Sequence, residues 1–240
     1  MKVTLTFDNG PWPGVTEKVL DTLAARDVRS TFFVVGNQLR KARSLAERAV
    51  AEGHWIGNHT MTHSVPLGDG ADPVDEIDAT QELIGDLAHP ARWFRPFGRG
   101  GVLDERLLST DGVAHLEAGG YSCVLWNSVP RDWEDPDAWI DRALADVEAN
   151  DWTVVVMHDL PTGAMDRLPR LLDELDARGA EIVQDFPDDC VPIRNGKLVA
   201  DLTGLICSGL GELGHELVEV EVVAPGGDLA VDHFEGAHHR

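Results

Sequence analysis

Two histidines four residues apart, His59 and His63, have the spacing that lets two imidazoles reach one metal ion. A backbone that is helical or turn-like between them would turn both rings to the same side. The chain contains ten histidines, so such a pair also arises often by chance, and the spacing alone is a weak signal. A metal held by this pair could serve chemistry or only the stability of the fold.

Polar residues that can do chemistry directly follow several predicted strands. They are Asp8, His59, Arg95, Asn127 and His158. The active sites of parallel barrels are built at the carboxyl ends of the strands, so we expect these side chains to converge on one pocket. Taken singly, each has a plain structural alternative: Asp8 could cap a turn, and His158 could be a hydrogen-bonded residue at a strand end.

The elements that must position these residues alternate between strands and helices. Apolar patterning predicts strands over residues 3–7, 31–35, 54–56, 92–94, 121–126 and 152–157. It predicts helices over residues 15–26, 39–52, 73–87, 104–117, 136–149 and 166–178. Such alternation implies a parallel sheet or barrel. Beyond residue 186 the pattern loosens, and residues 217–223 alternate like one added strand.

Several motifs occur in a fixed order along the chain. They are TFDNGP at residues 6–11, TFFVVG at 31–36, EGHWIGNHTMTH at 52–63, FRPFG at 94–98, DW at 132–133 and VVVMHD at 154–159. Over residues 3–185 the chain thereby resembles the polysaccharide deacetylases, the carbohydrate esterases of the nodulation-protein homology domain. The resemblance implies an α/β fold, a distorted (β/α) barrel of seven or eight parallel strands.

The resemblance also implies a role for each motif residue. Asp8 matches the general base of the family, and His158 matches the general acid that protonates the leaving nitrogen. Asp132 matches the carboxylate that supports this acid. His59 and His63 match two ligands of a divalent metal, which we expect to be zinc. Such a metal would polarise a carbonyl and lower the pKa of a bound water.

The opening motif departs from the family at Asn9. The family has a second Asp there, which is the third metal ligand, whereas the amide oxygen of Asn9 is neutral. Two imidazoles and one neutral oxygen should hold zinc less tightly. We therefore include Asn9 among the metal residues and expect weaker metal dependence.

Four residues are predicted to bind substrate: Arg95, Phe97, Arg131 and Trp133. The third motif has one proline fewer than is usual in the family, and Phe97 matches the aromatic residue beside the oxyanion hole. Arg131 could bind an anionic group or pair with a neighbouring carboxylate on the surface, with about equal weight. Trp133 could equally line the pocket or belong to the core.

The composition limits the classes of partner. The formal net charge is -22, from 42 acidic and 20 basic residues, which disfavours nucleic acid and anionic membranes. The first residues lack the pattern of a signal peptide, and no run of about 18 apolar residues occurs. Three cysteines at unrelated spacings indicate reduced thiols rather than a disulfide framework. We expect a cytoplasmic protein.

We predict a catalytic domain over residues 1–185 and a C-terminal extension over residues 186–240 that packs on it. The predicted activity is hydrolysis of an amide-type carbon–nitrogen bond, most simply N-deacetylation of an N-acetylated sugar. One alternative is an amidase for a small cyclic imide or ureide, with weakly bound metal or none. Another is a binding relative that kept the fold and lost the chemistry. The partner is a small molecule or saccharide, and homo-oligomerisation is left open.

Overall fold

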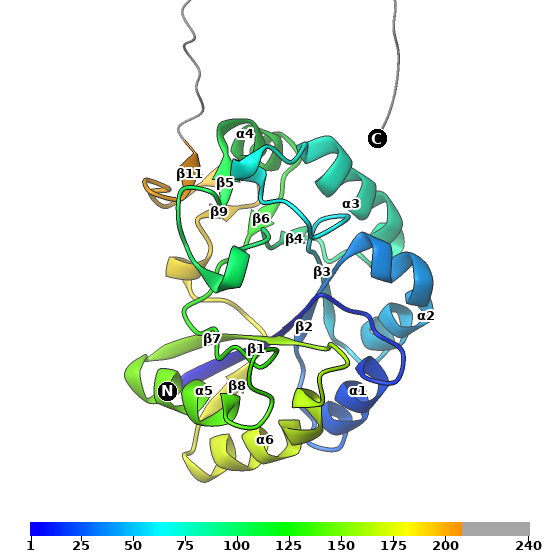
Figure 1. Cartoon of the computed structure of the whole chain (residues 1–240), viewed down its shortest axis with the longest axis vertical. Coiled ribbons are helices and arrows are strands. Elements are labelled where there is room, and N and C mark those ends of the chain that lie inside the picture. The colour runs from blue at the N-terminus through cyan, green and yellow to red at the C-terminus, as the bar shows by residue number, and fades with distance from the viewer. Residues whose placement is uncertain (208–240) are drawn as a thin grey trace, which may run out of the picture. The chain divides into compact units, whose positions relative to one another are not determined.

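A curled sheet of parallel strands forms the centre of the protein in the computed structural model, which describes residues 1–207 (Figure 1). Within these residues seven strands of this sheet run parallel. They are β1 (Lys2–Asp8), β2 (Thr31–Val34), β3 (Trp55–Asn58), β4 (Trp93–Phe94), β6 (Ser122–Cys123), β7 (Trp152–His158) and β8 (Glu181–Val183). Their order is β6-β4-β3-β2-β1-β7, and β8 pairs with the first half of β1.

Helices cover the outer face of this sheet (Figure 1). They are α1 (Thr16–Ala24), α2 (Gly36–Ala51), α3 (Ala79–Ile84), α4 (Thr110–Ala118), α5 (Trp139–Ala149) and α6 (Leu168–Ala177). Each long helix buries one apolar stripe. In α6 the buried residues are Leu168, Leu171, Leu172 and Leu175, at the spacing of one helical face.

The first strand shows how the sequence divides the two faces of the sheet. Val3, Leu5 and Phe7 belong to the large hydrophobic core under the helices. The intervening Thr4 and Thr6 are also buried, and the Thr6 hydroxyl donates to the carbonyl of Val155 at 2.8 Å. Because side chains alternate along a strand, Asp8 lies on the same polar inner face as these threonines.

The sheet closes into a barrel through one short stretch after β6. In the loop after β6, the carbonyl of Ser128 accepts a hydrogen bond from the amide of Val156 at 3.0 Å. The amide of Ser128 donates to the carbonyl of Val154 at 3.2 Å. This contact joins the two ends of the strand order. The seven parallel strands and their minimal closure confirm the predicted distorted (β/α) barrel.

Residues 186–207 pack on the same body as the barrel. The short strand β9 (Ile193–Arg194) pairs antiparallel with β6, and β10 (Lys197–Leu198) pairs with β9. A separate two-stranded sheet joins β11 (Ile206–Cys207) to β5 (Leu108–Ser109). The predicted strand at 217–223 lies outside the described residues. No helix among the described residues is long and apolar enough to cross a membrane.

Two predicted helices differ from the structure. The helix expected over residues 104–117 begins only at Thr110, because Asp104 starts a turn instead. Its carboxylate accepts from the amide of Arg106, and its carbonyl accepts from the amide of Leu107. The helix expected over residues 73–87 is divided into a wide turn at Val74–Asp78, α3, and a short turn at Gly85–Leu87. Gly85 has a φ of 54°, which is incompatible with a continuing helix.

Candidate active site

One pocket of about 210 Å³ opens at the carboxyl ends of β1, β3 and β7. It is lined by Asp8, Asn9, His59, His63, Pro96, Phe97, Gly98, Gly100, Gly101, Trp126, Val129, Trp133, Val156, His158 and Leu160. The pocket therefore contains both residues predicted for proton transfer and all three predicted for metal binding. Phe97 and Trp133, predicted to bind substrate, also line it.

Asp8 is held from below by Arg95. The guanidinium donates from Nη1 to Asp8 Oδ1 at 2.9 Å and to Thr6 Oγ1 at 2.7 Å, and it lies 4.1 Å from the ring centre of Phe33. Burial lowers the pKa of Arg95, while the charge and hydrogen bond of Asp8 oppose that shift. Arg95 is fully buried and does not line the pocket, which corrects the prediction that it contacts substrate. It orients Asp8 instead.

His158 is held by a buried carboxylate on the other side of the pocket. Its Nδ1 lies 2.8 Å from Asp132 Oδ1, and its backbone amide donates to Asp132 Oδ2 at 2.9 Å. Burial alone lowers the pKa of His158, but the hydrogen bond and charge of Asp132, with the charges of Asp8 and Asp159, raise it overall. Trp133 meets the imidazole edge-on at 4.7 Å. Since Nδ1 faces Asp132, Nε2 is left to face the pocket.

His59 and His63 have the opposite character. Burial lowers the pKa of each imidazole to about 3, so both are neutral near pH 7. His59 Nδ1 lies 2.8 Å from the carbonyl oxygen of Arg95, which favours the proton on Nδ1 and leaves the lone pair of Nε2 available. The two ring centres are 4.7 Å apart.

Asn9 completes a set of donors that fits a divalent cation. Its Oδ1 is buried and has no hydrogen-bond partner among the described residues. Neutral imidazoles and an amide oxygen are all acceptable ligands, although none brings a negative charge. Within residues 1–207 no three His, Cys, Asp or Glu side chains group together to hold a metal, and Asn9 adds a third candidate donor to the two histidines in the pocket.

Glu76 positions the segment between the two histidines and was missed in the sequence. It lies in the wide turn before α3, and its carboxylate accepts from the amides of Met61 and Thr62 at 2.8 and 2.9 Å and from the Thr62 hydroxyl at 2.6 Å. Thr60 and His63 have positive φ values of 66° and 52°. A left-handed backbone at such residues needs support from its surroundings, which Glu76 supplies. An isolated Glu in a predicted helix gives no sign of this role.

The wall beside Phe97 is closed by a glycine-rich segment. The Phe97 ring lies 4.0 Å from that of His63. Trp126 donates from Nε1 to the Gly101 carbonyl at 3.0 Å, and a Cβ at Gly98 would lie 2.5 Å from the same indole ring. Gly98 can therefore lie directly on Trp126 only because it lacks a side chain.

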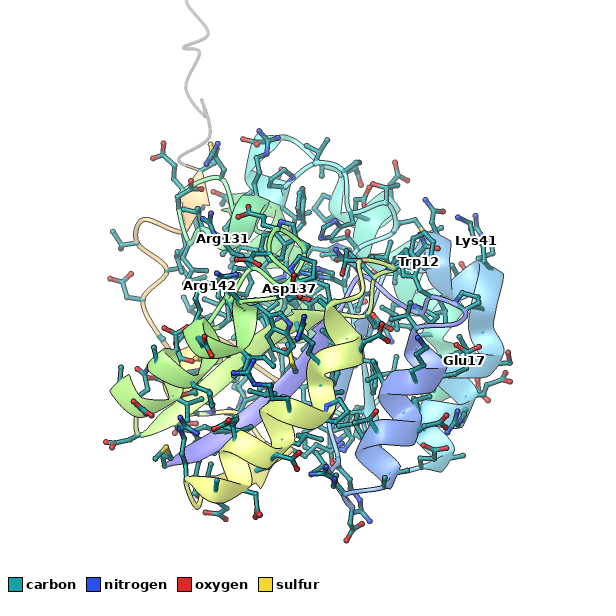
Figure 2. All side chains as sticks on the ribbon, turned by 60° about the horizontal axis from the view of Figure 1, so that its bottom comes forward. Trp12, Glu17, Lys41, Arg131, Asp137 and Arg142 are labelled. Carbon is teal, nitrogen blue, oxygen red and sulfur yellow. The ribbon has the colours of Figure 1, made fainter. Side chains whose placement is uncertain are left out.

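Two other polar candidates point elsewhere. Asn127 pairs with the backbone at the edge of β7, accepting from Val154 at 2.7 Å and donating to Trp152 at 2.9 Å. Arg131 is half exposed, lies 3.4 Å from Glu134, and does not line the pocket. Figure 2 shows Arg131 close to Arg142 of α5, whose guanidinium donates to the carbonyls of Pro130 and Arg131.

Comparison with known proteins gives consistent matches. The family model described as polysaccharide deacetylase matches residues 1–109. A chitooligosaccharide deacetylase of Sinorhizobium fredii is 36% identical over 165 residues, covering 65% of this chain and 71% of the relative. A peptidoglycan-N-acetylglucosamine deacetylase of Bacillus cereus is 30% identical over 199 residues, covering 79% of this chain and 71% of the relative.

Solved structures match over most of the barrel. The polysaccharide deacetylase Bc1974 from Bacillus cereus has a TM-score of 0.67 at 26% identity, covering 82% of this chain and 99% of that chain. A family 4 carbohydrate esterase from Streptomyces lividans in complex with acetate has a TM-score of 0.63 at 27% identity, covering 83% of this chain and 97% of that chain.

Proposed function

The chain belongs to the polysaccharide deacetylase family, hydrolases of carbon–nitrogen bonds other than peptide bonds, and we propose that it removes the acetyl group from an N-acetylated amino sugar. The observation that carries this proposal is the pairing of Asp8 with His158 in the register of β1 and β7. Each is fixed by a different buried partner, Arg95 for Asp8 and Asp132 for His158. One base and one acid thus face the same pocket.

Asp8 acts as the general base in this proposal. Its Oδ1 is occupied by Arg95, whereas Oδ2 lies 3.5 Å from His59 Nε2 at the pocket. The carboxylate takes a proton from the water that attacks the acetyl carbonyl. Arg95 keeps the carboxylate in one orientation throughout, so no side-chain reorganisation is needed when the proton moves.

His158 acts as the general acid. The raised pKa keeps a useful fraction of the imidazolium present near neutral pH, and Nε2 faces the pocket. Breakdown of the tetrahedral intermediate requires a proton on the amine nitrogen, because an unprotonated amide nitrogen is a poor leaving group. The carboxylate of Asp132 lies 2.8 Å from Nδ1 and stabilises the imidazolium before the proton is delivered.

The metal belongs to the same proposal. Asn9, His59 and His63 would hold a divalent cation, for which we propose zinc as the first candidate. When bound, it would polarise the acetyl carbonyl and lower the pKa of a water. The chain's own contribution is to keep both imidazoles neutral and to present the unpartnered amide oxygen of Asn9.

A second candidate is hydrolysis of a small cyclic amide. The neutral donor at Asn9 favours it, because this site offsets less of a cation's charge than a carboxylate would. The apolar walls at Trp126, Val129 and Val156 also favour it, since they offer few polar partners for the hydroxyls of a long glycan. The same base and acid would serve both reactions.

The test uses the purified full chain with N-acetylglucosamine oligomers and, separately, with hydantoin and allantoin. Each assay is run with added zinc and with chelator, and beside Asp8→Asn. Acetate release from the oligomers that is lost in Asp8→Asn supports the first candidate. Ring opening without acetate release replaces it with the second, and turnover of neither class by the zinc-supplemented protein contradicts both.

A further inference from the structure

Asp159 is a buried acidic residue that takes no direct part in the proposed proton transfers. It directly follows His158, and its side chain is fully buried. Thr16, the first residue of α1, donates its hydroxyl to Asp159 Oδ2. The other oxygen, Oδ1, has no hydrogen-bond partner among the described residues. Burial raises the pKa of this carboxyl to about 7, so its neutral form is readily available.

The carboxyl of Asp159 lies directly against the turn that follows the catalytic base. A Cβ added at Gly10 would overlap both carboxylate oxygens, so the Gly10 backbone packs on the carboxyl without intervening atoms. Thr16 also accepts from the amide of Trp12 at 2.7 Å through the same hydroxyl oxygen that reaches Asp159. Figure 2 shows Trp12 at this turn, before α1. Asp159 thus supports the turn at two residues: it contacts Gly10 directly and Trp12 through the Thr16 hydroxyl.

The turn needs such support because it carries a left-handed residue. Asn9 has a φ of 73°, a conformation that is uncommon for a residue other than glycine and costs free energy unless its surroundings enforce it. On the opposite side, the Gly10 carbonyl accepts from the amide of Val35 at 3.1 Å. Asp8 immediately precedes Asn9, so a shift of this turn would move the base and the amide oxygen together.

We infer that Asp159 is a positioning residue, whose carboxyl fixes the turn from Asn9 to Trp12 against the end of β7 and so sets Asp8 and Asn9 opposite His158. The inference rests on the proposed function only where activity is the readout. Because Asp159 adjoins the acid in sequence and contacts the turn of the base, it couples the two halves of the site through one side chain.

The decisive variants are Asp159→Ala and Asp159→Asn. The alanine variant removes the support, whereas asparagine keeps the shape and an acceptor oxygen for Thr16. We expect Asp159→Ala to lower kcat about 100-fold with KM changed less than about threefold, since small misplacement of catalytic groups has effects of this size. Asp159→Asn should restore kcat to within about fivefold of the wild type.

Thr16→Val and Thr16→Ser provide a second pair that is less disruptive to folding. Thr16→Val removes the bridge to Trp12 and should lower kcat about tenfold, and Thr16→Ser should retain it. The matched control is Ser30→Ala, which removes a buried hydroxyl bonded to the Leu5 carbonyl beside the start of β2, away from the pocket. It should lower the melting temperature without changing kcat.

Amide chemical shifts of the full chain separate this inference from the proposed function. Asp159→Ala, or Thr16→Val if the former does not fold, should shift the amides of Gly10 and Trp12, whereas Ser30→Ala should not. Unchanged shifts at both residues overturn the inference whatever the activity. Turn amides that shift while the wild type hydrolyses no substrate overturn the proposed function alone. A wild-type kcat in folded Asp159→Ala or Thr16→Val also overturns the inference.

Discussion

Histidines on the two sides of the pocket have opposite pKa shifts although all are largely buried. The pKa values of His59 and His63 are lowered to about 3, with burial as the largest cause. Burial acts in the same direction on His158, but Asp132 reverses it through a hydrogen bond and a full charge. The partner of each imidazole therefore decides its chemistry: one side offers neutral ligands and the other offers a proton donor.

The two sides also differ in how they are built. Asp8 ends β1 and His59 directly follows β3, and the neighbouring strand β2 fixes the place of each. His158 also ends a strand, but its partner Asp132 comes from the irregular segment after β6, 26 residues away in sequence. That segment is held by Arg142 of α5, which donates to the Pro130 carbonyl at 2.7 Å. The acid therefore depends on loop packing more than the base does.

The largest expected effect is from Asp8→Asn, which removes the base and leaves the shape of the pocket. We expect kcat/KM to fall about 1,000-fold, a typical contribution of general base catalysis, with zinc binding largely retained. Steady-state kinetics on N-acetylglucosamine oligomers measure this. The control is Asp151→Asn, an exposed Asp beside the start of β7 at the far end of the barrel. Equal losses in both variants would show that the effect is not specific to the base.

Asp132→Asn tests the cause of the raised pKa directly. Without the carboxylate, burial should dominate and the pKa of His158 should fall toward those of His59 and His63. Because the acid works in its protonated form, activity is lost as the pH rises through this pKa. The alkaline limb of the pH profile should therefore move to lower pH, with kcat down about 100-fold near neutral pH.

A pH profile of Asp132→Asn that keeps the alkaline limb of the wild type would remove Asp132 from the explanation of that limb. The raised pKa of His158 would then have to come from the charges of Asp8 and Asp159, because burial lowers the pKa of all three histidines. Titration of the histidine resonances in the full chain gives an independent check, because it measures each imidazole without substrate.

The ends of the strands and the buried carboxylate Asp132 could be predicted from the sequence, whereas the supporting roles of Arg95 and Glu76 could not. Asp8 and His158 were assigned because apolar runs stop at them and the family motifs coincide there. Arg95 was predicted to bind substrate because it also follows a strand, yet its side chain turns inward under Asp8. Which way a strand-end side chain turns depends on contacts such as Thr6 and Phe33, which lie far away in sequence.

The helices show the same limit on a larger scale. The regular helices of the barrel follow from apolar periodicity alone, as in α6. The predicted helix over residues 73–87 is interrupted at Gly85, where a φ of 54° does not fit a helix. Before that point, Glu76 bonds the segment between His59 and His63, a contact that periodicity does not record. The local apolar pattern thus specifies the helices and strands of the barrel, while tertiary hydrogen bonds specify how the site residues are oriented.

Asn9→Asp adds a negative charge beside His59 and His63, and so tests the contrast between these neutral ligands and the charged pair of His158 and Asp132. A carboxylate in place of the amide should tighten zinc binding about tenfold or more, since it offsets part of the cation's charge. Calorimetric titration with zinc alone measures this, and His59→Ala is the control that should abolish binding in either background. Equal affinity in the wild type and Asn9→Asp would show that residue 9 does not contact the cation.

The smallest effect is expected from Arg131→Ala, because that side chain is half exposed and, among residues 1–207, forms an ion pair only with Glu134 at 3.4 Å. Exposed pairs of this kind contribute little, so kcat and KM should stay within about twofold. Trp133→Ala removes the pocket wall beside His158 and should raise KM clearly more. A larger loss of kcat/KM in Arg131→Ala that occurs only with anionic substrates would show that the guanidinium contacts the substrate. The part of the pocket around His158 would then include Arg131. Equally small changes in kcat and KM with neutral and anionic substrates would instead limit this part of the site to His158, Asp132 and Trp133.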